Sequence, residues 1–402
     1  MASERKSINL MLVAGEPSGD QLGAELMSAL KSLAGDRISF SGVGGTAMSA
    51  QGLQSLFPLD VTSVIGLRAI MPRIPEILRR VRVASDFALA SRADAVICID
   101  SPEFTHRVAG RIRRGNKHIP IINYVAPQVW AWRPGRATKM ARIFDLVLAL
   151  LPFESALFET HGLRAPFVGH PVVERAGRMQ GGAELRGRLG IPATAPVLGV
   201  LPGSRISEIQ PLLPVFRETV ARMKQEVPDL VCVLPAVQHL AGNIRALTNG
   251  WPVALHLLEG EADKFAAFDA ANAALAASGT VTSELALAGV PMAVAYKGGW
   301  LSSRIARALI RVPHLTLVNI LLGREAVPEF VQARCRAELI APCLVRLLTD
   351  QEFSARQKQD LHEAVRLLGG EGEAPSLRAA RMVLQFIAER CPDGPQRSSS
   401  GV

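Results

Sequence analysis

The chain has 402 residues, of which 49% are hydrophobic and 20% are charged. That balance is typical of a globular protein of two or three domains and excludes a largely disordered chain. Its 45 Lys and Arg exceed its 36 Asp and Glu, for a formal net charge of +9, so we expect an anionic partner. The charge alone does not choose among a phosphate ligand, a nucleic acid and a membrane surface, but only 5% of the residues are aromatic, which argues against single-stranded nucleic-acid binding by base stacking.

The cysteines and the apolar segments indicate the compartment. Five cysteines without a closely spaced pair fit neither a disulfide framework nor a zinc site, and they predict a reducing cytoplasm. The apolar run at 8–14 is short and contains Asn9, so we interpret it as a buried strand rather than a signal peptide. The stretch 273–296 carries Glu284 and Pro291, so we predict no transmembrane helix.

Short apolar strands alternate with amphipathic helices, the pattern of an α/β protein with parallel sheets. In the first half the predicted strands are 8–14, 38–41, 95–99, 120–124, 146–150 and 166–168, with helices at 21–34 and 74–91. After an irregular stretch at 172–195 the alternation begins again. Here the predicted strands are 197–201, 230–234, 253–257, 272–276 and 292–296, with helices near 211–225, 261–270, 280–288 and 300–311.

This pattern predicts two α/β domains, at 1–180 and 181–365, whose parallel sheets face a central cleft. We expect the helix within 366–390 to pack back on the N-terminal domain or on a partner chain. The Ser-, Gly- and Pro-rich tail 391–402 is predicted to be disordered. Because ligands of such sheets bind at the carboxyl ends of the strands, the residues just after each strand are the candidate site residues.

Two glycine-containing loops follow the first two strands. The loop from Gly15 to Asp20 is either an anion or sugar site at a helix N-terminus, or a tight turn in which Ser18 or Asp20 caps the helix. The loop 42–47 matches a loose dinucleotide-binding pattern. It follows the second strand and no acid stands at the expected distance, so we interpret it as a glycine turn.

An acid ends the buried strand 95–99. Asp100 is placed to act as a general base, although a helix cap or a structural hydrogen bond would also explain it, and Glu103 could share the role. The chain has no G-x-S-x-G motif, which disfavours an α/β-hydrolase. Trp130 and Trp132 follow the next strand, where they form either a ligand wall or part of the core.

Two loops of the second domain suit an anion. Gly203, Ser204 and Arg205 lead into a helix, an arrangement that fits either a diphosphate or a capping turn with a solvated arginine. Ser278, Gly279 and Thr280 repeat this design, and Glu284 follows, where it either complements the helix dipole or accepts hydrogen bonds from a ribose. The chain has no D-x-D motif and no His/Cys cluster, so we predict neither a metal nor a cofactor.

Basic amphipathic helices are predicted at 74–82 and 301–311, with either a solvated face or a face that docks on an anionic membrane. The segment before the first of them is apolar for a loop. That segment favours a lipid-facing surface formed by Val64, Ile65, Leu67, Ile70 and Met71.

Taken together, these motifs resemble the lipid-A-disaccharide synthase family, inverting glycosyltransferases of the GT-B type, from about residue 8 to residue 388. The resemblance rests on AGEPSGD at 14–20, VIG at 64–66, IDSPEF at 99–104, YVAPQVWAWR at 124–133, LPFE at 151–154, FVGHP at 167–171, LPGSRISEI at 201–209, SGTVTSE at 278–284 and Asn319 followed by LLGRE at 321–325.

The resemblance implies a GT-B-like fold of two Rossmann-like domains and a specific reaction. 2,3-Diacylglucosamine passes from UDP-2,3-diacylglucosamine to the 6-hydroxyl of 2,3-diacylglucosamine 1-phosphate. The products are the β-1,6-linked lipid A disaccharide and UDP, in lipopolysaccharide biosynthesis of Gram-negative bacteria. It also implies a metal-independent enzyme without cofactor, peripheral on the inner face of the inner membrane, with a homodimer as one option.

The resemblance also implies residue roles. Asp100 matches the family's proposed base, Arg205 a diphosphate ligand and Glu284 a contact to ribose or uracil. Asn319 and Glu16 match important positions whose roles are undefined. The chain has Glu103-Phe104-Thr105 where the family commonly has Asp-Phe-Asn, and it has Ala126 and Val318 where Ser and Pro are common.

Two other kinds of protein remain open on the sequence. One is another UDP-N-acetylglucosamine-type glycosyltransferase or an epimerase of the same fold. The other is a non-catalytic protein that binds a UDP-sugar or a lipid.

Overall fold

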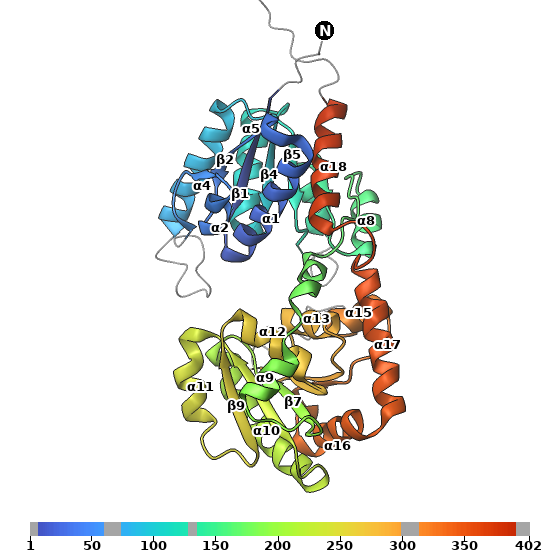
Figure 1. Ribbon diagram of the computed structural model, residues 1–402. Helices are drawn as coiled ribbons and strands as arrows, with labels where there is room; N and C mark the ends of the chain where they lie inside the picture. Colours follow the sequence, from blue (N-terminus) through green and yellow to red (C-terminus); the bar gives the residue numbers. More distant parts are fainter. Residues whose placement is uncertain (1–6, 60–73, 128–134, 299–312, 391–402) are drawn as a thin grey trace, which may run out of the picture. The chain divides into compact units, whose positions relative to one another are not determined.

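The structure is a computed structural model that describes residues 7–59, 74–127, 135–298 and 313–390 (Figure 1). The chain forms two compact units, and each is described by itself. Unit 1 comprises Met1–Pro171 and Glu371–Val402, and unit 2 comprises Val172–Gly370. The sequence had predicted divisions after residues 180 and 365. Within the described residues, no helix combines the length and the apolar character needed to cross a bilayer.

Unit 1 is built on a six-stranded sheet in which every pairing is parallel. Its strands lie in the order β3-β2-β1-β4-β5-β6. They are β1 (Ile8–Ala14), β2 (Ile38–Val43), β3 (Gln54–Ser55), β4 (Ala95–Ile99), β5 (Ile121–Tyr124) and β6 (Leu146–Leu148). Strand β4 is buried throughout, as expected of a central strand covered on both faces.

Helices cover both faces of this sheet. Alternate residues of β1 point to opposite faces, so the strand contributes to a core on each side. Leu10 and Leu12 belong to one core and Met11 and Val13 to another. The helices of unit 1 are α1 (Pro17–Ala34), α2 (Thr46–Ala50), α4 (Ile74–Ala90), α5 (Pro102–Gly115), α7 (Gly135–Ala141), α8 (Pro152–Glu159) and α18 (Pro375–Arg390), with a 3-10 turn at Gly35–Arg37.

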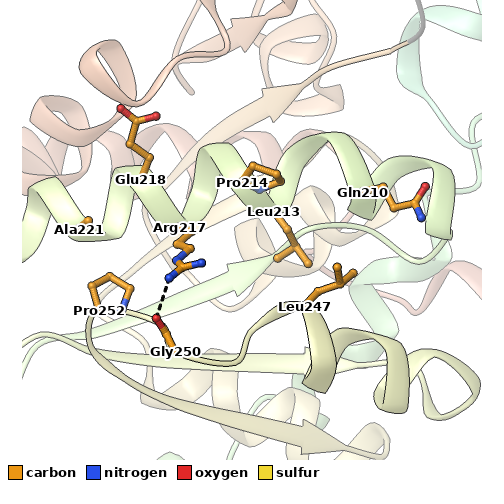
Figure 2. A pocket seen from close by; sticks show the side chains of 9 residues that line it. All are labelled: Gln210, Leu213, Pro214, Arg217, Glu218, Ala221, Leu247, Gly250 and Pro252. Carbon is orange, nitrogen blue, oxygen red and sulfur yellow. Dashed lines mark hydrogen bonds between the residues drawn. The ribbon is translucent and has the colours of Figure 1, made fainter.

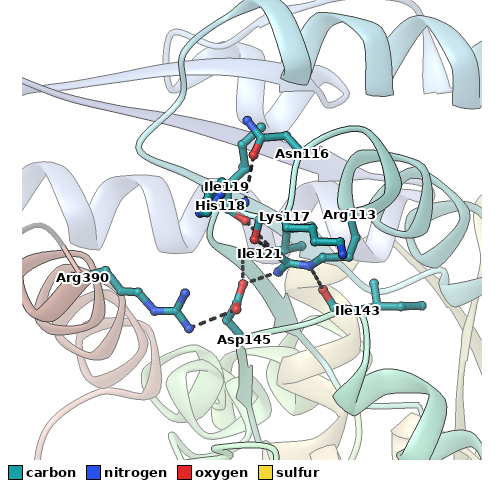
Figure 3. A network of polar contacts seen from close by, with 9 residues as sticks. All are labelled: Arg113, Asn116, Lys117, His118, Ile119, Ile121, Ile143, Asp145 and Arg390. Carbon is teal, nitrogen blue, oxygen red and sulfur yellow. Dashed lines mark hydrogen bonds and ion pairs between the residues drawn. The ribbon is translucent and has the colours of Figure 1, made fainter. Parts of the chain in front are cut away.

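The last helix of the chain belongs to the first unit. Val383 and Phe386 of α18 are buried in the same core as Leu26 and Leu30 of α1. Figure 3 shows how the end of α18 is tied to the sheet: Asp145 accepts bonds from Arg390 (3.0 Å), from Arg113 and from the backbone N–H of Ile121 (2.9 Å). The helix therefore packs on its own chain here, and its exchange between two chains of a homodimer stays a prediction.

Unit 2 repeats the design with strand order β12-β11-β10-β7-β8-β9, again all parallel. Its strands are β7 (Val197–Leu201), β8 (Val231–Ala236), β9 (Ala254–Glu259), β10 (Ala273–Ala277), β11 (Met292–Tyr296) and β12 (Glu329–Val331). Its helices are α9 (Gly182–Arg188), α10 (Ile206–Glu226), α11 (Ala241–Leu247), α12 (Glu261–Ala270), α13 (Thr280–Leu287), α15 (Leu317–Leu322), α16 (Ala337–Thr349) and α17 (Gln351–Leu367). Short 3-10 segments lie at Pro171–Arg178, Gln238–Leu240 and Gln332–Arg334.

Most predicted elements are confirmed, and the differences have physical reasons. The strand predicted at 166–168 is only an isolated bridge between Phe167 and Ala149. The stretch predicted as a connection, 172–195, contains α9. Strands β3 and β12 were missed because they are two and three residues long, too short for an apolar pattern. The predicted helix 300–311, the apolar segment 61–72 and the tail 391–402 lie wholly or largely outside the described residues.

Candidate active site

A strained turn follows β4. Asp100 and Ser101 both have positive φ angles, 51° and 43°, a conformation that non-glycine residues rarely adopt and that gathers at functional sites. The buried Thr105 holds the turn, because its hydroxyl lies 2.7 Å from the carbonyl oxygen of Asp100 and 3.1 Å from that of Ser101. The residue at which this chain departs from the family motif therefore supports the backbone of the candidate base.

The loop after β1 lies directly against this turn. A Cβ atom at Gly15 would stand 2.6 Å from the Ser101 hydroxyl oxygen, so only glycine fits without a shift. This close approach lets Ser18 donate a hydrogen bond to Oδ2 of Asp100 (2.8 Å), and lets Ser101 donate to Oε1 of Glu16 (3.3 Å). Glu16 and Asp100 thus belong to one hydrogen-bonded cluster, and both side chains are only half-buried.

This cluster has the parts of a general-base site. A partly exposed carboxylate that accepts one directional hydrogen bond can take a proton from a substrate hydroxyl with its remaining lone pairs. The sequence pattern suggested a helix cap for Ser18 and no role for Ser101. Their hydrogen bonds to Asp100 and Glu16 depend on the neighbouring order of β1 and β4 in the sheet, which no local motif reports.

Asp20 fills the position that a ligand would need in the second glycine loop. Its buried carboxylate accepts the backbone N–H groups of Gly45 (2.7 Å), Ala47 (2.9 Å) and Met48 (3.0 Å), at the start of α2. These are the donors that a bound pyrophosphate would use. The interpretation of 42–47 as a glycine turn is confirmed, and Asp20 of α1 accepts the hydrogen bonds of its backbone N–H groups.

A second strained turn follows β5, the neighbour of β4. Val125 has a φ of 73°, an outlier for a β-branched residue, and its carbonyl oxygen accepts a hydrogen bond from Nδ2 of Asn123 (3.0 Å). Oδ1 of Asn123 lies 3.1 Å from Nε2 of His106. Burial, with a further contribution from Arg136, lowers the pKa of His106 to about 4, so the ring is neutral at pH 7.

The remaining site residues predicted in unit 1 are Glu103, the two tryptophans and the membrane-facing residues. Glu103 is exposed and forms an ion pair with Arg136 (2.8 Å). Trp130 and Trp132 lie outside the described residues, as do the predicted membrane-facing residues Val64, Ile65, Leu67, Ile70 and Met71.

In unit 2, the turns after β7 and β10 lie at one edge of the sheet, since these strands are direct neighbours. Ser204 and Arg205 occupy the first turn, and the Arg205 side chain is 59% exposed. Its guanidinium forms an ion pair with Glu208 (2.8 Å), whose other oxygen accepts the backbone N–H of Ser204 (3.3 Å). A carboxylate of the chain therefore occupies the donors predicted for a diphosphate.

The turn after β10 is open to solvent. Gly279 and Thr280 are exposed and Ser278 is half-buried, and Gly279 has a φ of 152° at the start of α13. The turn is fixed by the Thr282 hydroxyl, which donates to the carbonyl oxygen of Gly279 (2.8 Å).

Glu284 is a buried carboxylate at the centre of an ion cluster whose two cations are partly exposed. Its side chain is 4% exposed, and its two oxygens contact Arg175 (2.6 Å) and Lys264 (2.8 Å). The ammonium of Lys264 also lies 4.9 Å from the centre of the Phe265 ring. Two cations and one carboxylate leave one net positive charge. Sequence reasoning missed Arg175 and Lys264, because neither belongs to a motif and both come from other elements.

Asn319 is completely buried and uses its whole amide group within the chain. Its Nδ2 donates to the carbonyl oxygen of Val327 (2.7 Å) and to Glu329 (2.8 Å), and its Oδ1 accepts the N–H groups of Ala326 and Val327 (both 2.8 Å). The sequence had predicted a cleft contact without a defined role. That contact stays a prediction; these hydrogen bonds tie α15 to the residues from Ala326 to Glu329 that lead into β12.

A hollow of about 470 Å³ lies on unit 2. Figure 2 shows the residues that line it: Gln210, Leu213, Pro214, Arg217, Glu218, Ala221, Leu247, Gly250 and Pro252. Gly250 and Pro252 precede β9, so the hollow lies toward the amino ends of the strands. Ligands of parallel sheets bind at the opposite edge, which separates this hollow from the candidate site.

Two units of this kind, each a six-stranded parallel sheet covered by helices, define the GT-B fold of glycosyltransferases and related epimerases. Among solved structures, the chain is similar to a UDP-N-acetylglucosamine 2-epimerase of Neisseria meningitidis (TM-score 0.60, 12% identity, 95% of this chain and 100% of that chain). It is also similar to MurG of Acinetobacter baumannii (TM-score 0.56, 17% identity, 95% and 99%). At sequence identities this low, the similarity establishes the shared fold only.

The particular family follows from the sequence comparisons. The model of the lipid-A-disaccharide synthetase family matches residues 10–383. Lipid-A-disaccharide synthases of Rhodospirillum centenum and Rhodopseudomonas palustris are 47% and 46% identical, over 96% and 94% of this chain and 96% of each relative. The chain belongs to this family and is a glycosyltransferase of lipid A biosynthesis. The resemblance inferred from the motifs is confirmed, against the epimerase and the non-catalytic binding protein.

The buried amide of Asn319 generates a prediction. Replacing Asn319 with Ala leaves the Glu329 carboxylate and several backbone groups buried without this partner, so we expect the free energy of unfolding to fall by about 3 kcal/mol or more. Urea unfolding measures this loss, with the exposed Asn249→Ala as a control that should change stability by less than about 0.5 kcal/mol. A variant with normal stability and impaired UDP binding would instead make Asn319 a ligand contact.

Proposed function

We propose that the enzyme transfers 2,3-diacylglucosamine from UDP-2,3-diacylglucosamine to the 6-hydroxyl of 2,3-diacylglucosamine 1-phosphate. The products are the β-1,6-linked disaccharide 1-phosphate and UDP. The observation that carries the proposal for this chain's own residues is the Asp100 carboxylate, held in a strained turn at the carboxyl end of β4 and accepting a hydrogen bond from Ser18. Strain at a polar strand end is a mark of a functional site rather than of a cap.

The proposed chemistry is one displacement with inversion at the anomeric carbon. Asp100 removes the proton of the 6-hydroxyl while that oxygen forms its bond to the anomeric carbon. The bond from this carbon to the UDP oxygen breaks on the opposite face, and UDP leaves with the electron pair. The Ser18 hydroxyl orients the carboxylate for this step, and Glu16 acts through Ser101 as a positioning residue.

We assign UDP binding to the two turns of unit 2. Arg205 and Ser204 would hold the diphosphate, and Ser278, Gly279 and Thr280 would place a second helix N-terminus beside it. The support is that both turns follow neighbouring strands and that the Arg205 guanidinium is exposed. Fixed cations and helix N-termini stabilise the charge that develops on a departing diphosphate. Binding requires Glu208 to release Arg205.

We place Glu284 at the ribose or uracil end of the nucleotide. Arg175 and Lys264 form ion pairs with its carboxylate, and the surplus positive charge of this cluster favours an anionic ligand nearby. A ribose hydroxyl that binds Glu284 would share or replace one of these two ion pairs.

Turnover by the purified protein tests the substrates directly. With both acylated substrates in detergent and a chelator present, we expect mass spectrometry to detect the disaccharide 1-phosphate and UDP. Binding of UDP without product, across several acyl lengths, would contradict the assigned substrates.

Asp100→Asn tests the base. The change removes the proton acceptor but keeps the shape of the side chain, so kcat should fall by about 10²- to 10⁴-fold while the Kd for UDP stays within about twofold. Asp36→Asn, on an exposed turn, is the matched control and should keep full activity. A normal kcat in Asp100→Asn would remove Asp100 from the role of base.

Arg205→Ala tests the diphosphate contact. Losing a charged hydrogen bond should weaken UDP binding, measured by calorimetry, by about 10- to 100-fold. Arg222→Ala, farther along the same helix, removes an equal charge and should leave the Kd unchanged. Equal UDP affinities in wild type and Arg205→Ala would exclude Arg205 from the site.

We further propose that the enzyme works on the inner face of the inner membrane, where Val64, Ile65, Leu67, Ile70 and Met71 contact lipid. Both proposed substrates are acylated, and the adjoining start of α4 exposes Ile74 and Leu78 by 43% and 48%. Docking through α4 and this segment needs no membrane-spanning helix.

Changing Ile70 and Met71 to Ser should weaken cosedimentation with anionic vesicles while the melting temperature stays unchanged, because apolar surface is lost only at the bilayer. The double variant Val237→Ser/Leu339→Ser removes exposed apolar side chains from unit 2 and should sediment like wild type. Equal sedimentation of all three proteins would count against the proposed segment.

A further inference from the structure

A long basic groove lies on unit 1, apart from the residues assigned to the reaction. It has a volume of about 850 Å³ and is lined by residues of α4, α5 and α7 and of the segment between α7 and β6. Its lining on α5 extends from Pro102 and Glu103 to Arg113 and Arg114, which is nearly the whole helix. At 1.5 Å per residue, the thirteen residues from Pro102 to Arg114 make this side of the groove about 20 Å long.

The groove carries more positive charge than its carboxylates neutralise. Eight lining residues are Lys or Arg and one is Glu. Three of the arginines have carboxylate partners: Arg111 pairs with Asp86, Arg113 with Asp145 and Arg136 with Glu103. The other five form no ion pair with a carboxylate of the residues that the structure describes, and all five are exposed: Arg82, Arg107, Arg114, Lys139 and Arg142.

Within the described part of unit 1, no carboxylate balances the positive charge of these five side chains. Exposed cations that share one groove repel one another, so the arrangement costs stability unless an anion joins them. Among the described lining residues, His106 is the one further titratable group. Burial and Arg136 lower its pKa to about 4, so it is neutral at pH 7 and leaves the balance unchanged.

The floor and one rim of the groove are aliphatic. Val81 and Met140 are 6% and 1% exposed at the floor, whereas Leu78 on the rim is 48% exposed. On α4, Ile74, Leu78 and Arg82 follow at four-residue spacing, so exposed apolar side chains and a groove cation share one helix face. Among the residues that the structure describes, no Phe, Tyr or Trp lines the groove, which argues against the stacking surface that a single-stranded nucleic acid needs.

We propose that this groove binds the phosphate headgroups of anionic phospholipids. The five cations contact phosphate oxygens, and Leu78 with Ile74 contacts the first carbons of the acyl chains. The inference deepens the proposed membrane location, on which it rests, by assigning a headgroup site on α5 and α7 in addition to the apolar segment before α4.

The length and charge of the groove favour phospholipid over the phosphate of the acceptor. One phosphate monoester carries a charge of about −2 at pH 7 and needs two or three donors within a few ångströms. Five cations along about 20 Å suit several headgroups. Asp100 is absent from the lining, so an acceptor phosphate deep in the groove would not be placed by the residue that activates the acceptor.

Vesicle binding by the double variant Arg114→Gln/Arg142→Gln tests the proposal. Both side chains are exposed, with Arg114 near the end of α5 and Arg142 just after α7, so the fold should persist, as a melting curve will show. Each basic residue near an anionic surface strengthens binding about fivefold, so the partition coefficient on vesicles containing phosphatidylglycerol should fall about 25-fold. The matched control Arg336→Gln/Lys358→Gln, exposed in unit 2, removes the same charge and should change it less than twofold.

Three outcomes would overturn the proposal. An equal loss in the control pair would mean that only net charge matters. Unchanged vesicle binding with a raised KM for the acceptor in detergent would make the groove an acceptor site. Equal weakening on zwitterionic phosphatidylcholine vesicles, whose phosphate is balanced by choline, would remove the requirement for a net anionic headgroup. Because partitioning needs no turnover, failure of the proposed reaction would show instead as normal vesicle binding without product.

Discussion

The approach of two loops at the carboxyl edge of unit 1 is the constraint on which the candidate base depends. Gly15 allows the loop after β1 to touch Ser101, and that contact brings Ser18 within 2.8 Å of Asp100. The turn itself stays in its unfavourable φ region because Thr105 holds its carbonyl oxygens. Strain of about 1–3 kcal/mol per residue is maintained by the packing of β1 and β4 in the centre of the sheet.

The features that could be predicted from the sequence are those that depend on local patterns of residues. Buried strands such as 95–99 and 197–201 are continuous apolar runs, and they were located to the residue. Since ligand residues follow strand ends, the turns with Asp100, Arg205 and Ser278 could be selected from the same pattern. The order of these motifs then indicated the family, which the comparisons confirm.

What the sequence could not predict depends on contacts between distant segments. Arg175 and Lys264 reach Glu284 from elements far along the chain, and Asn319 is satisfied by residues after its own helix. Glu208 could have been paired with Arg205 from its three-residue spacing, but its second bond to Ser204 requires the backbone of the turn. The basic groove could not be predicted from the sequence either, because its cations come from three helices and the segment after α7.

The position of α18 has a consequence for synthesis of the chain. The face of the unit 1 sheet that carries α1 is completed by residues 375–390, whereas the strands of that sheet are finished before residue 172. About 220 residues must therefore be translated before the first unit can close, which takes roughly 10–40 s at typical rates. Unit 2 emerges from the ribosome during this time and can fold first. Leu26 and Leu30 of the first unit meanwhile lack the side chains of α18 that complete their core.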